Sequence, residues 1–193
     1  LLRETNPSPR QQEYIGLIEN AGRTLNTLGN DVLDYAKLEA GKLELEQSPF
    51  DPAALLIDCA HMFSLPASDN GDLVLVDADA DIPAQLRGDA PRLRQVLTNL
   101  LSNAIKFTRH GWIRVGARCL EERDGRAMIE FTVSDSGIGM TREEQRRLFQ
   151  NFSQASASVA QRFGGTGLGL SISQELVRLM GGDIEVRSAP EQG

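Results

Sequence analysis

The chain has 193 residues, of which 40% are hydrophobic and 24% charged, a balance typical of one globular domain, or one domain with an appendage. Its net charge of −7 argues against nucleic acid as a partner, because binding to phosphate backbones needs clustered Lys and Arg. Two cysteines are too few for a disulfide framework, and no apolar run approaches the ~18 residues of a membrane span, so we expect buried thiols and no membrane contact from this segment.

The first predicted element is a long helix that begins near Ser8 and ends at Gly41. Ser8 is a good N-cap, Pro9 suits the first helical position, and Gln11 completes a capping box. Apolar residues recur along this helix at intervals of four and three positions: Tyr14, Ile18, Ala21, Leu25, Leu28, Val32 and Tyr35. This heptad stripe is typical of a helical bundle or coiled coil. We therefore expect it to pack on a partner helix or a second subunit, unless the helix folds back on its own domain.

After Gly41, the hydrophobic patterns typical of strands and of helices alternate along the chain. Strands are predicted at residues 42–46, 73–76, 112–120, 127–134 and 184–186, the third and fourth as a hairpin. Helices are predicted at residues 53–63, 89–107, 141–149 and 168–180. Residues 65–71 and 150–163 are predicted loops, the second of them mobile because few of its residues are hydrophobic. These elements predict an α+β fold with one mixed sheet layered on helices, and a closing strand of that sheet is expected beyond Gly193.

The helix at residues 89–107 carries three polar residues on one side. Asn99 and Asn103 are four positions apart and Lys106 is three further on, so the three side chains project in the same direction. Two carboxamide oxygens and one ammonium suit a hydrated Mg²⁺ that carries phosphates. Taken alone, a solvated helix face with two asparagines is the commoner interpretation.

A second motif places Asp135 at the end of an apolar strand, before Gly137 and Gly139. A carboxylate at this point can accept a hydrogen bond from the exocyclic amine of a base, and the glycines let a ring approach the backbone. An ordinary strand-to-helix turn explains the same residues equally well.

A third motif, residues 162–170, is rich in glycine and leads directly into a helix. Glycines before a helix N-terminus expose N–H groups to an anion, and the helix dipole adds to the attraction. No Lys-Ser/Thr pair follows, so it is not a P-loop, and a polar loop rather than a strand precedes it, so it is not a Rossmann fingerprint. Arg162 supplies a cation for a terminal phosphate, or is an ordinary exposed arginine.

Together, in this order and spacing, the three motifs resemble the N, G1 and G2 boxes of the sensor histidine kinases, within the ATPase family that includes gyrase and Hsp90-type proteins. Residues 149–154 resemble the F box, and the resemblance covers nearly the whole chain. It implies that residues 47–193 are a catalytic and ATP-binding domain with a two-layer α/β sandwich. It implies that residues 1–46 are the C-terminal part of a dimerisation and histidine phosphotransfer hairpin. The lid sequence most resembles hybrid sensor kinases.

The resemblance also implies roles for the polar residues of the first motif. Asn103 matches the Mg²⁺ ligand of the family, Asn99 its companion, and Lys106 a phosphate contact, so Asn99 and Lys106 are the expected catalytic residues. ATP-hydrolysing relatives carry Glu at the position of Asn99, where it activates water. Asparagine is not a base, so we expect phosphoryl transfer to a protein acceptor, with Mg²⁺ and positioning supplying most of the catalysis.

The other two motifs take their roles from the same resemblance. Asp135 matches the aspartate that recognises the adenine amino group, with Gly137 and Gly139 beside the base. Phe149 and Phe152 are expected to pack the lid. The phosphates and the lid hinge are expected at Arg162, Gly165, Thr166, Gly167, Leu168 and Gly169.

One departure from the family concerns histidine. The chain has two, His61 and His110, and neither has the sequence context of a phosphoacceptor, so both are expected to be structural or exposed. The acceptor is expected upstream of Leu1. We therefore expect ATP binding without autophosphorylation in cis, and transfer through an outside histidine to an aspartate of a response-regulator receiver domain.

The resemblance finally implies a setting for the chain. The full protein is expected to be a homodimer through the hairpin, and this segment the cytoplasmic part of a membrane-anchored sensor. The alternative is a kinase-like regulatory module that binds ATP and controls another sensor kinase through the helical bundle. An ATP hydrolase is a third possibility, disfavoured by Asn99.

Overall fold

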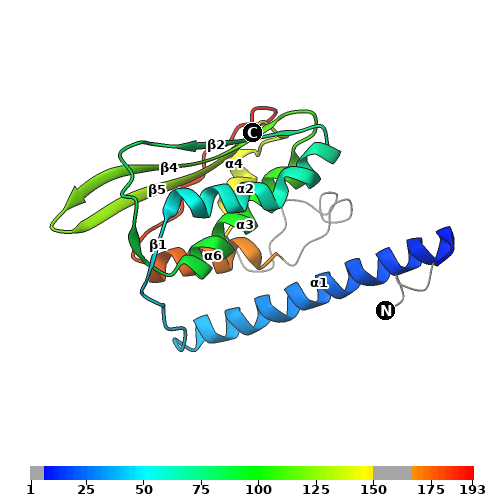
Figure 1. Ribbon diagram of the computed structural model, residues 1–193, viewed down its shortest axis with the longest axis horizontal. Helices are drawn as coiled ribbons and strands as arrows, with labels where there is room; N and C mark the ends of the chain where they lie inside the picture. The colour runs from blue at the N-terminus through cyan, green and yellow to red at the C-terminus, as the bar shows by residue number, and fades with distance from the viewer. Residues whose placement is uncertain (1–6, 150–166) are drawn as a thin grey trace. The chain divides into compact units, whose positions relative to one another are not determined.

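The structure is a computed structural model that describes residues 7–149 and 167–193 and divides into two compact units, Leu1–Leu43 and Glu44–Gly193. The first unit contains helix α1 (Pro9–Glu39), whose predicted capping box is confirmed (Figure 1). The Ser8 hydroxyl accepts a hydrogen bond from the Gln11 amide, and the Gln11 side chain accepts one from the Ser8 amide at 2.8 Å. These bonds satisfy two amides that a helix start otherwise leaves unpaired.

Large apolar side chains on α1 are exposed to solvent. Their exposed fractions lie between 48% and 70% for Tyr14, Leu17, Ile18, Leu25, Val32 and Leu33. A helix with so much exposed apolar surface gains stability by packing on another surface.

The second unit is built on a mixed three-stranded sheet. Strand β4 (Trp112–Arg123) lies in the centre, parallel to β2 (Leu73–Ala78) and antiparallel to β5 (Arg126–Asp135). The predicted hairpin is confirmed, because Asp124 and Gly125 between β4 and β5 both have positive φ angles, 53° and 72°. Two consecutive positive φ angles are the signature of a tight turn that matches the twist of its strands.

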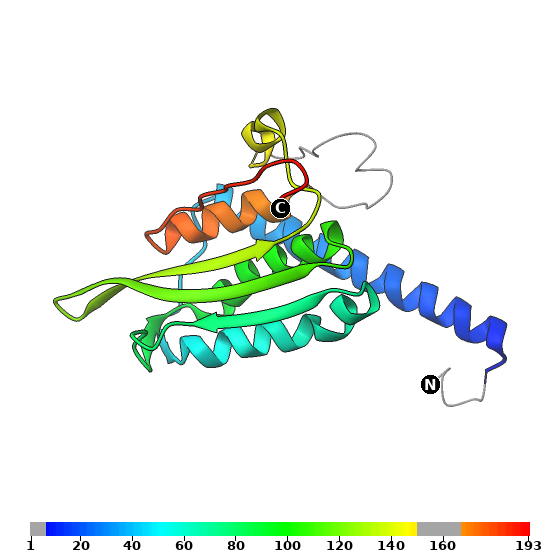
Figure 2. The ribbon, with the colours of Figure 1, turned by 90° about the horizontal axis from the view of Figure 1, so that it is seen from above.

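Helices cover one face of this sheet. Figures 1 and 2 show β2, β4 and β5 as one layer, with the second layer formed by α2 (Pro52–Asp69), α3 (Ala90–Phe107) and α6 (Gly169–Leu179). The core between the layers includes fully buried side chains from both: Leu56, Cys59, Leu97, Leu101, Ile113 and Val115. Burial raises the pKa of the Cys59 thiol, whereas Cys119 is only half-buried. The arrangement confirms the predicted α+β sandwich.

The first strand of this unit does not lie where the sequence predicted it. Residues 42–46 form no strand; pairing begins at β1 (Ser48–Phe50), which runs antiparallel to β3 (Leu86–Gly88). The Glu46 amide donates instead to the Asp89 carboxylate at 2.9 Å. The alternating pattern at residues 42–46 therefore has no partner strand, and β3 is too short for its own pattern to predict it.

Helix α2 is longer than predicted. It continues through Pro66, so the predicted loop at residues 65–71 is wrong over most of its length. Proline removes one helical hydrogen bond, but the next residue, Ala67, is completely buried, and this packing holds the last turn. The helix stops before Gly71, which has a φ of 77°.

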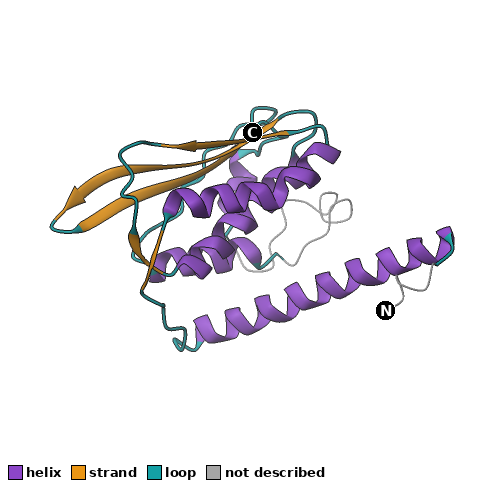
Figure 3. Cartoon of the chain, viewed as in Figure 1, coloured by secondary structure: helices purple, strands orange, loops and turns teal. Residues whose placement is uncertain are grey.

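The predicted strand at residues 184–186 is also wrong. Residues 183–189 form no strand, and Figure 3 shows the chain after α6 as loop. The Ile184 amide donates to the neighbouring Asp183 carboxylate at 2.8 Å, as in a turn, instead of to a facing strand. The chain then turns at residues 188–193, against the loop that follows β5.

No helix in the described ranges is both long and apolar enough to cross a lipid bilayer.

Candidate functional site

Helix α3 forms the backbone of the candidate site. Its N-cap, Asp89, is buried and accepts hydrogen bonds from the Arg92 and Glu46 amides, each at 2.9 Å. One face of the helix lies in the core through Val96, Leu97, Leu101, Ala104 and Ile105. The predicted site residues Asn99, Asn103 and Lys106 are only partly buried. The predicted helix thus presents all three to a partly accessible side.

Asn99 connects α3 to α6. Its amide nitrogen donates to the hydroxyl of Ser173, which is 2% exposed, at 2.9 Å. A methyl group on Gly169, the first residue of α6, would lie 2.5 Å from the Asn99 amide oxygen, so only glycine fits there without a shift. The sequence prediction missed Ser173, although a small polar residue on the core-facing side of α6 was a signal for such a contact.

Asn103 and Lys106 lie further along the same helix. Within residues 7–149 and 167–193, no group is hydrogen-bonded to the Asn103 carboxamide, so its oxygen is available to a ligand. Burial lowers the pKa of Lys106, and its ammonium lies 5.0 Å from the centre of the Phe107 ring. A partly desolvated ammonium gains stability when an anion approaches it. The carboxamide oxygen of Asn103 can coordinate a metal ion, and the ammonium of Lys106 can bind the oxygens of a phosphate that carries the metal.

Asp135 ends strand β5 beside the C-terminus of α3. Its Oδ1 accepts hydrogen bonds from the Gly137 amide at 2.9 Å and from the fully buried Thr108 hydroxyl at 3.5 Å. In the part of the chain that the structure describes, nothing is bonded to Oδ2. One oxygen therefore fixes the orientation of the carboxylate and the other can accept a bond from a ligand. Thr108 was not predicted, because its partner lies 27 residues away.

Gly137 and Gly139 have a structural reason in addition to the predicted one. A methyl group on Gly137 would lie 2.5 Å from the Phe107 carbonyl oxygen. Gly139 has a φ of 61°, and a side chain there would overlap the Ala189 carbonyl. The two glycines thus let the loop after β5 pass between the end of α3 and the turn at residues 188–193.

The glycine-rich loop is described only at its end. Gly167 has a φ of 69°, Leu168 is 3% exposed, and α6 begins at Gly169 without a side-chain cap among the described residues. Four residues named above lie outside the described ranges, so their predicted roles are not tested: Phe152, Arg162, Gly165 and Thr166. Phe149 is half-buried just after α4 (Arg142–Arg147). The predicted helix start after the loop is confirmed.

The two histidines are exposed, as predicted. His61 lies on α2, and His110 follows α3 with a φ of 54°.

A family model described as histidine kinase-, DNA gyrase B- and HSP90-like ATPase matches residues 88–193, more than half of the chain. The chain belongs to this ATPase family. All of the site residues described above on α3, on β5 and at the start of α6 fall within the matched range. The resemblance inferred from the three motifs is therefore confirmed.

Curated relatives are sensor kinases. Over its whole length the chain is 45% identical to the sensor protein GacS of Pseudomonas syringae pv. syringae. It is 42% identical to the signal transduction histidine-protein kinase BarA of Escherichia coli. This ATPase-family chain spans 21% of the length of each of these relatives.

Solved structures agree with the fold. The chain matches full-length ShkA in complex with AMPPNP with a TM-score of 0.75 and 33% identity, over 93% of this chain and 36% of that one. It matches the Acinetobacter baumannii histidine kinase AdeS with a TM-score of 0.73, over 96% of this chain and 81% of that one. At 20% identity, the second match shows the fold alone.

Proposed function

We propose that residues 47–193 are the catalytic and ATP-binding domain of a hybrid-type sensor histidine kinase. The domain transfers the γ-phosphoryl group of ATP to a histidine outside this chain, for relay to an aspartate of a response-regulator receiver domain. The observation that carries the proposal is the order of groups along α3. Asp135 lies at the C-terminal end of the helix, Asn103 and Lys106 lie along it, and Asn99 contacts the start of α6.

This order suits a nucleotide. Thr108 lies nine positions after Asn99, a separation of about 14 Å along α3, since each position adds about 1.5 Å. A base at Asp135 therefore leaves room for a ribose and phosphates before the N-terminus of α6. The positive end of that helix dipole favours phosphate charge.

The base end favours adenine. The Oδ2 of Asp135, which has no hydrogen-bond partner among the described residues, is an acceptor held in place by the bonds to Oδ1. Adenine offers a donating amino group at the position where guanine offers an accepting carbonyl. A carboxylate in this position therefore discriminates in favour of ATP and against GTP.

The middle of the site fits Mg²⁺ and phosphate. The Asn103 oxygen is the type of ligand that Mg²⁺ prefers, and the partly desolvated ammonium of Lys106 is proposed to contact phosphate oxygens. When bound, Mg²⁺ supplies neutralisation of the charge on the phosphates. The residues of this chain bind and orient ATP, which accounts for most of the catalysis in phosphoryl transfer.

Asn99 supports transfer over hydrolysis. An amide cannot take a proton from water, and the Asn99 nitrogen already donates to Ser173. We assign Asn99 to the catalytic site as a residue that holds the start of α6 beside the phosphates, together with Gly167, Leu168 and Gly169. Arg162, Gly165 and Thr166 are proposed to complete the phosphate end.

Residues 1–46 are proposed to be part of a dimerisation and phosphotransfer hairpin. The exposed apolar side chains of α1 and its heptad spacing support this assignment, because a second copy would bury them. The full protein would then be a homodimer, with this segment on the cytoplasmic side of a membrane-anchored sensor.

Two measurements test the proposed function. The first is titration of the chain with a fluorescent ATP analogue, with and without Mg²⁺; no saturable binding would refute the proposal. The second is incubation with labelled ATP and, as acceptor, the full-length protein carrying Asp135→Asn, at an ATP concentration low enough that this variant incubated alone takes up no label. Label on the acceptor supports a kinase. Binding without label supports the regulatory module, and release of phosphate without label supports a hydrolase.

A further inference from the structure

The turn at residues 188–193 is hydrogen-bonded to the loop that follows Asp135. The Ser188 hydroxyl accepts a bond from the Met140 amide at 2.8 Å, and the Glu191 amide donates to the Ile138 carbonyl, also at 2.8 Å. The same hydroxyl donates to the Gly193 carbonyl at 2.8 Å, which closes the turn on itself. The loop at residues 138–140 is thus held at both ends by a segment about 50 residues further along the chain.

Gln145 on α4 joins the loop and the turn. Its amide nitrogen donates to the Met140 carbonyl at 3.0 Å and to the Ser188 carbonyl at 2.8 Å. A primary amide has two N–H groups, so these bonds use its full donor capacity. Both Gln145 and Ser188 are partly buried here, which makes each bond less replaceable by water.

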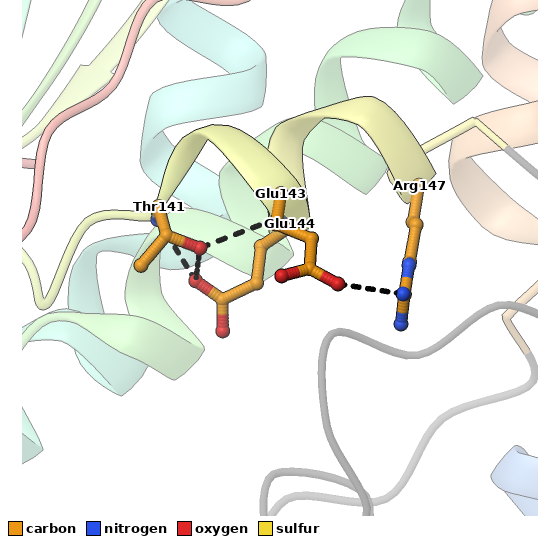
Figure 4. A network of polar contacts seen from close by, with 4 residues as sticks. All are labelled: Thr141, Glu143, Glu144 and Arg147. Carbon is orange, nitrogen blue, oxygen red and sulfur yellow. Dashed lines mark hydrogen bonds and ion pairs between the residues drawn. The ribbon is translucent and has the colours of Figure 1, made fainter.

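Helix α4 is itself fixed where it meets the loop. The Glu144 carboxylate accepts bonds from the amide and the hydroxyl of Thr141, each at 2.8 Å (Figure 4). The bond from the Thr141 amide lowers the pKa of Glu144, so the capping box is intact at neutral pH. Glu143 and Arg147 form an ion pair at 2.7 Å on the exposed side of the helix, away from the loop. Gln145 therefore acts from an anchored helix turn.

The opposite side of the loop meets α3. The Ile138 amide donates to the Phe107 carbonyl at 3.3 Å, and Gly137 passes too close to that carbonyl for a side chain. The loop is therefore held between α3 and the turn at residues 188–193. Its position determines where the chain lies next to Asp135.

We propose that Gln145 and Ser188 are positioning residues for base recognition, an inference that rests on the proposed function. They hold the backbone of residues 138–140 in the place that leaves the Asp135 carboxylate correctly oriented beside the adenine. Loss of the Gln145 or the Ser188 side chain releases one side of the loop but changes no contact of Asn99, Asn103 or Lys106. The effect is therefore expected on nucleotide affinity and on base selectivity, with turnover at saturating ATP unchanged.

The test compares Gln145→Ala and Ser188→Ala with Gln192→Ala in the full-length kinase. Gln192 lies in the same turn with an exposed side chain, so its replacement makes the same Gln-to-Ala change without touching the loop. We expect each of the first two variants to weaken ATP binding about 3- to 10-fold, as for a lost neutral hydrogen bond, and to reduce the preference for ATP over GTP. The Met140 amide should exchange its hydrogen faster, and Gln192→Ala should behave as the parent protein.

A conservative variant separates positioning from folding. Ser188→Thr keeps the hydroxyl and should retain the ATP-to-GTP preference, while Ser188→Ala loses part of it. Because both residues act on one loop, the double variant should lose less than the product of the single losses. An unchanged preference in Gln145→Ala and Ser188→Ala, or a fall in turnover at unchanged KM, would overturn the inference. So would equal effects of Ser188→Thr and Ser188→Ala.

Asp135→Asn measured in parallel separates the positioning role of Gln145 and Ser188 from base recognition by Asp135. If it changes the ATP-to-GTP preference and the Gln145 and Ser188 variants do not, only the positioning role fails. If Asp135→Asn also leaves the preference unchanged, base recognition by Asp135 in the proposed function fails.

Discussion

Replacing Asp135 with asparagine tests the base end of the site with almost no change in shape. The asparagine oxygen can keep the 2.9 Å bond from the Gly137 amide, so the loop retains its anchor. The amide nitrogen then occupies the place of Oδ2, the oxygen proposed to accept the adenine amino group. Two donors would face each other with ATP, whereas the guanine carbonyl of GTP would meet a donor.

The expected magnitude follows from the bond that is lost. A hydrogen bond to a charged group contributes about 1.5–3 kcal/mol, which corresponds to an affinity for ATP about 10- to 150-fold lower. Affinity for GTP should rise, or fall by much less. The preference between the two nucleotides should therefore shrink or reverse.

Competition against a fluorescent ATP analogue measures both dissociation constants. Asp124→Asn is the matched control, because it makes the same chemical change in the β4–β5 hairpin turn, where asparagine accepts the positive φ of 53°. Thermal unfolding of all three proteins checks that the fold is retained. An ATP affinity within about threefold of the parent, or an equal loss for ATP and GTP, would refute the assigned role of Asp135.

Three further predictions concern stability. Ser173→Ala removes the partner of Asn99 and should lower the free energy of unfolding by about 0.5–1.5 kcal/mol in urea titration; an unchanged midpoint would contradict the α3–α6 contact. Leu101→Ala should cost about 2–5 kcal/mol by the same assay, and Leu101→Met less than about 1.5 kcal/mol, because Leu101 is completely buried. The capping box of α4 should be lost only as pH falls through the lowered pKa of Glu144, seen in the NMR shift of the Thr141 amide; a midpoint at or above the ordinary glutamate value would contradict the bond.

Helix starts could be predicted well because their signals are local. Ser8, Asp51, Asp89 and Thr141 are all N-caps in the structure, and each accepts a hydrogen bond from an amide three residues further on. Such a bond depends on a few neighbouring residues, so the sequence alone contains the information. The β4–β5 hairpin is predictable for the same reason.

Elements that depend on distant partners were predicted poorly. The patterns at residues 42–46 and 184–186 look like strands, but a strand forms only where a second strand offers its hydrogen-bonding edge. Pro66 looks like a helix end, but burial of Ala67 carries α2 past it. In each case a tertiary contact outweighed the local preference.

In the candidate site, too, local features were predicted and contacts between distant residues were not. Helix geometry alone predicts that Asn99, Asn103 and Lys106 share one side of α3, and the structure agrees. The residues that orient Asn99 and Asp135 are distant in sequence from them: Ser173 is 74 positions from Asn99, and Thr108 is 27 positions from Asp135. No local sequence pattern indicates which residues form such distant pairs, so these two hydrogen bonds could be identified only from the structure.

Asn99 shows what the structure adds to a motif. The sequence offers one reason for asparagine at this position, the absence of a base that would activate water. The bond to Ser173 and the closeness of Gly169 give a second reason. The Asn99 amide nitrogen donates to Ser173 on α6, while the amide oxygen lies against Gly169, the first residue of the same helix. A glutamate has no N–H to donate, and its extra methylene would push against Gly169. We infer that the lack of a hydrolytic base and the attachment of α6 to α3 are two consequences of one residue. The position proposed to favour transfer over hydrolysis would then also fix the helix whose N-terminus is proposed to bind the phosphates.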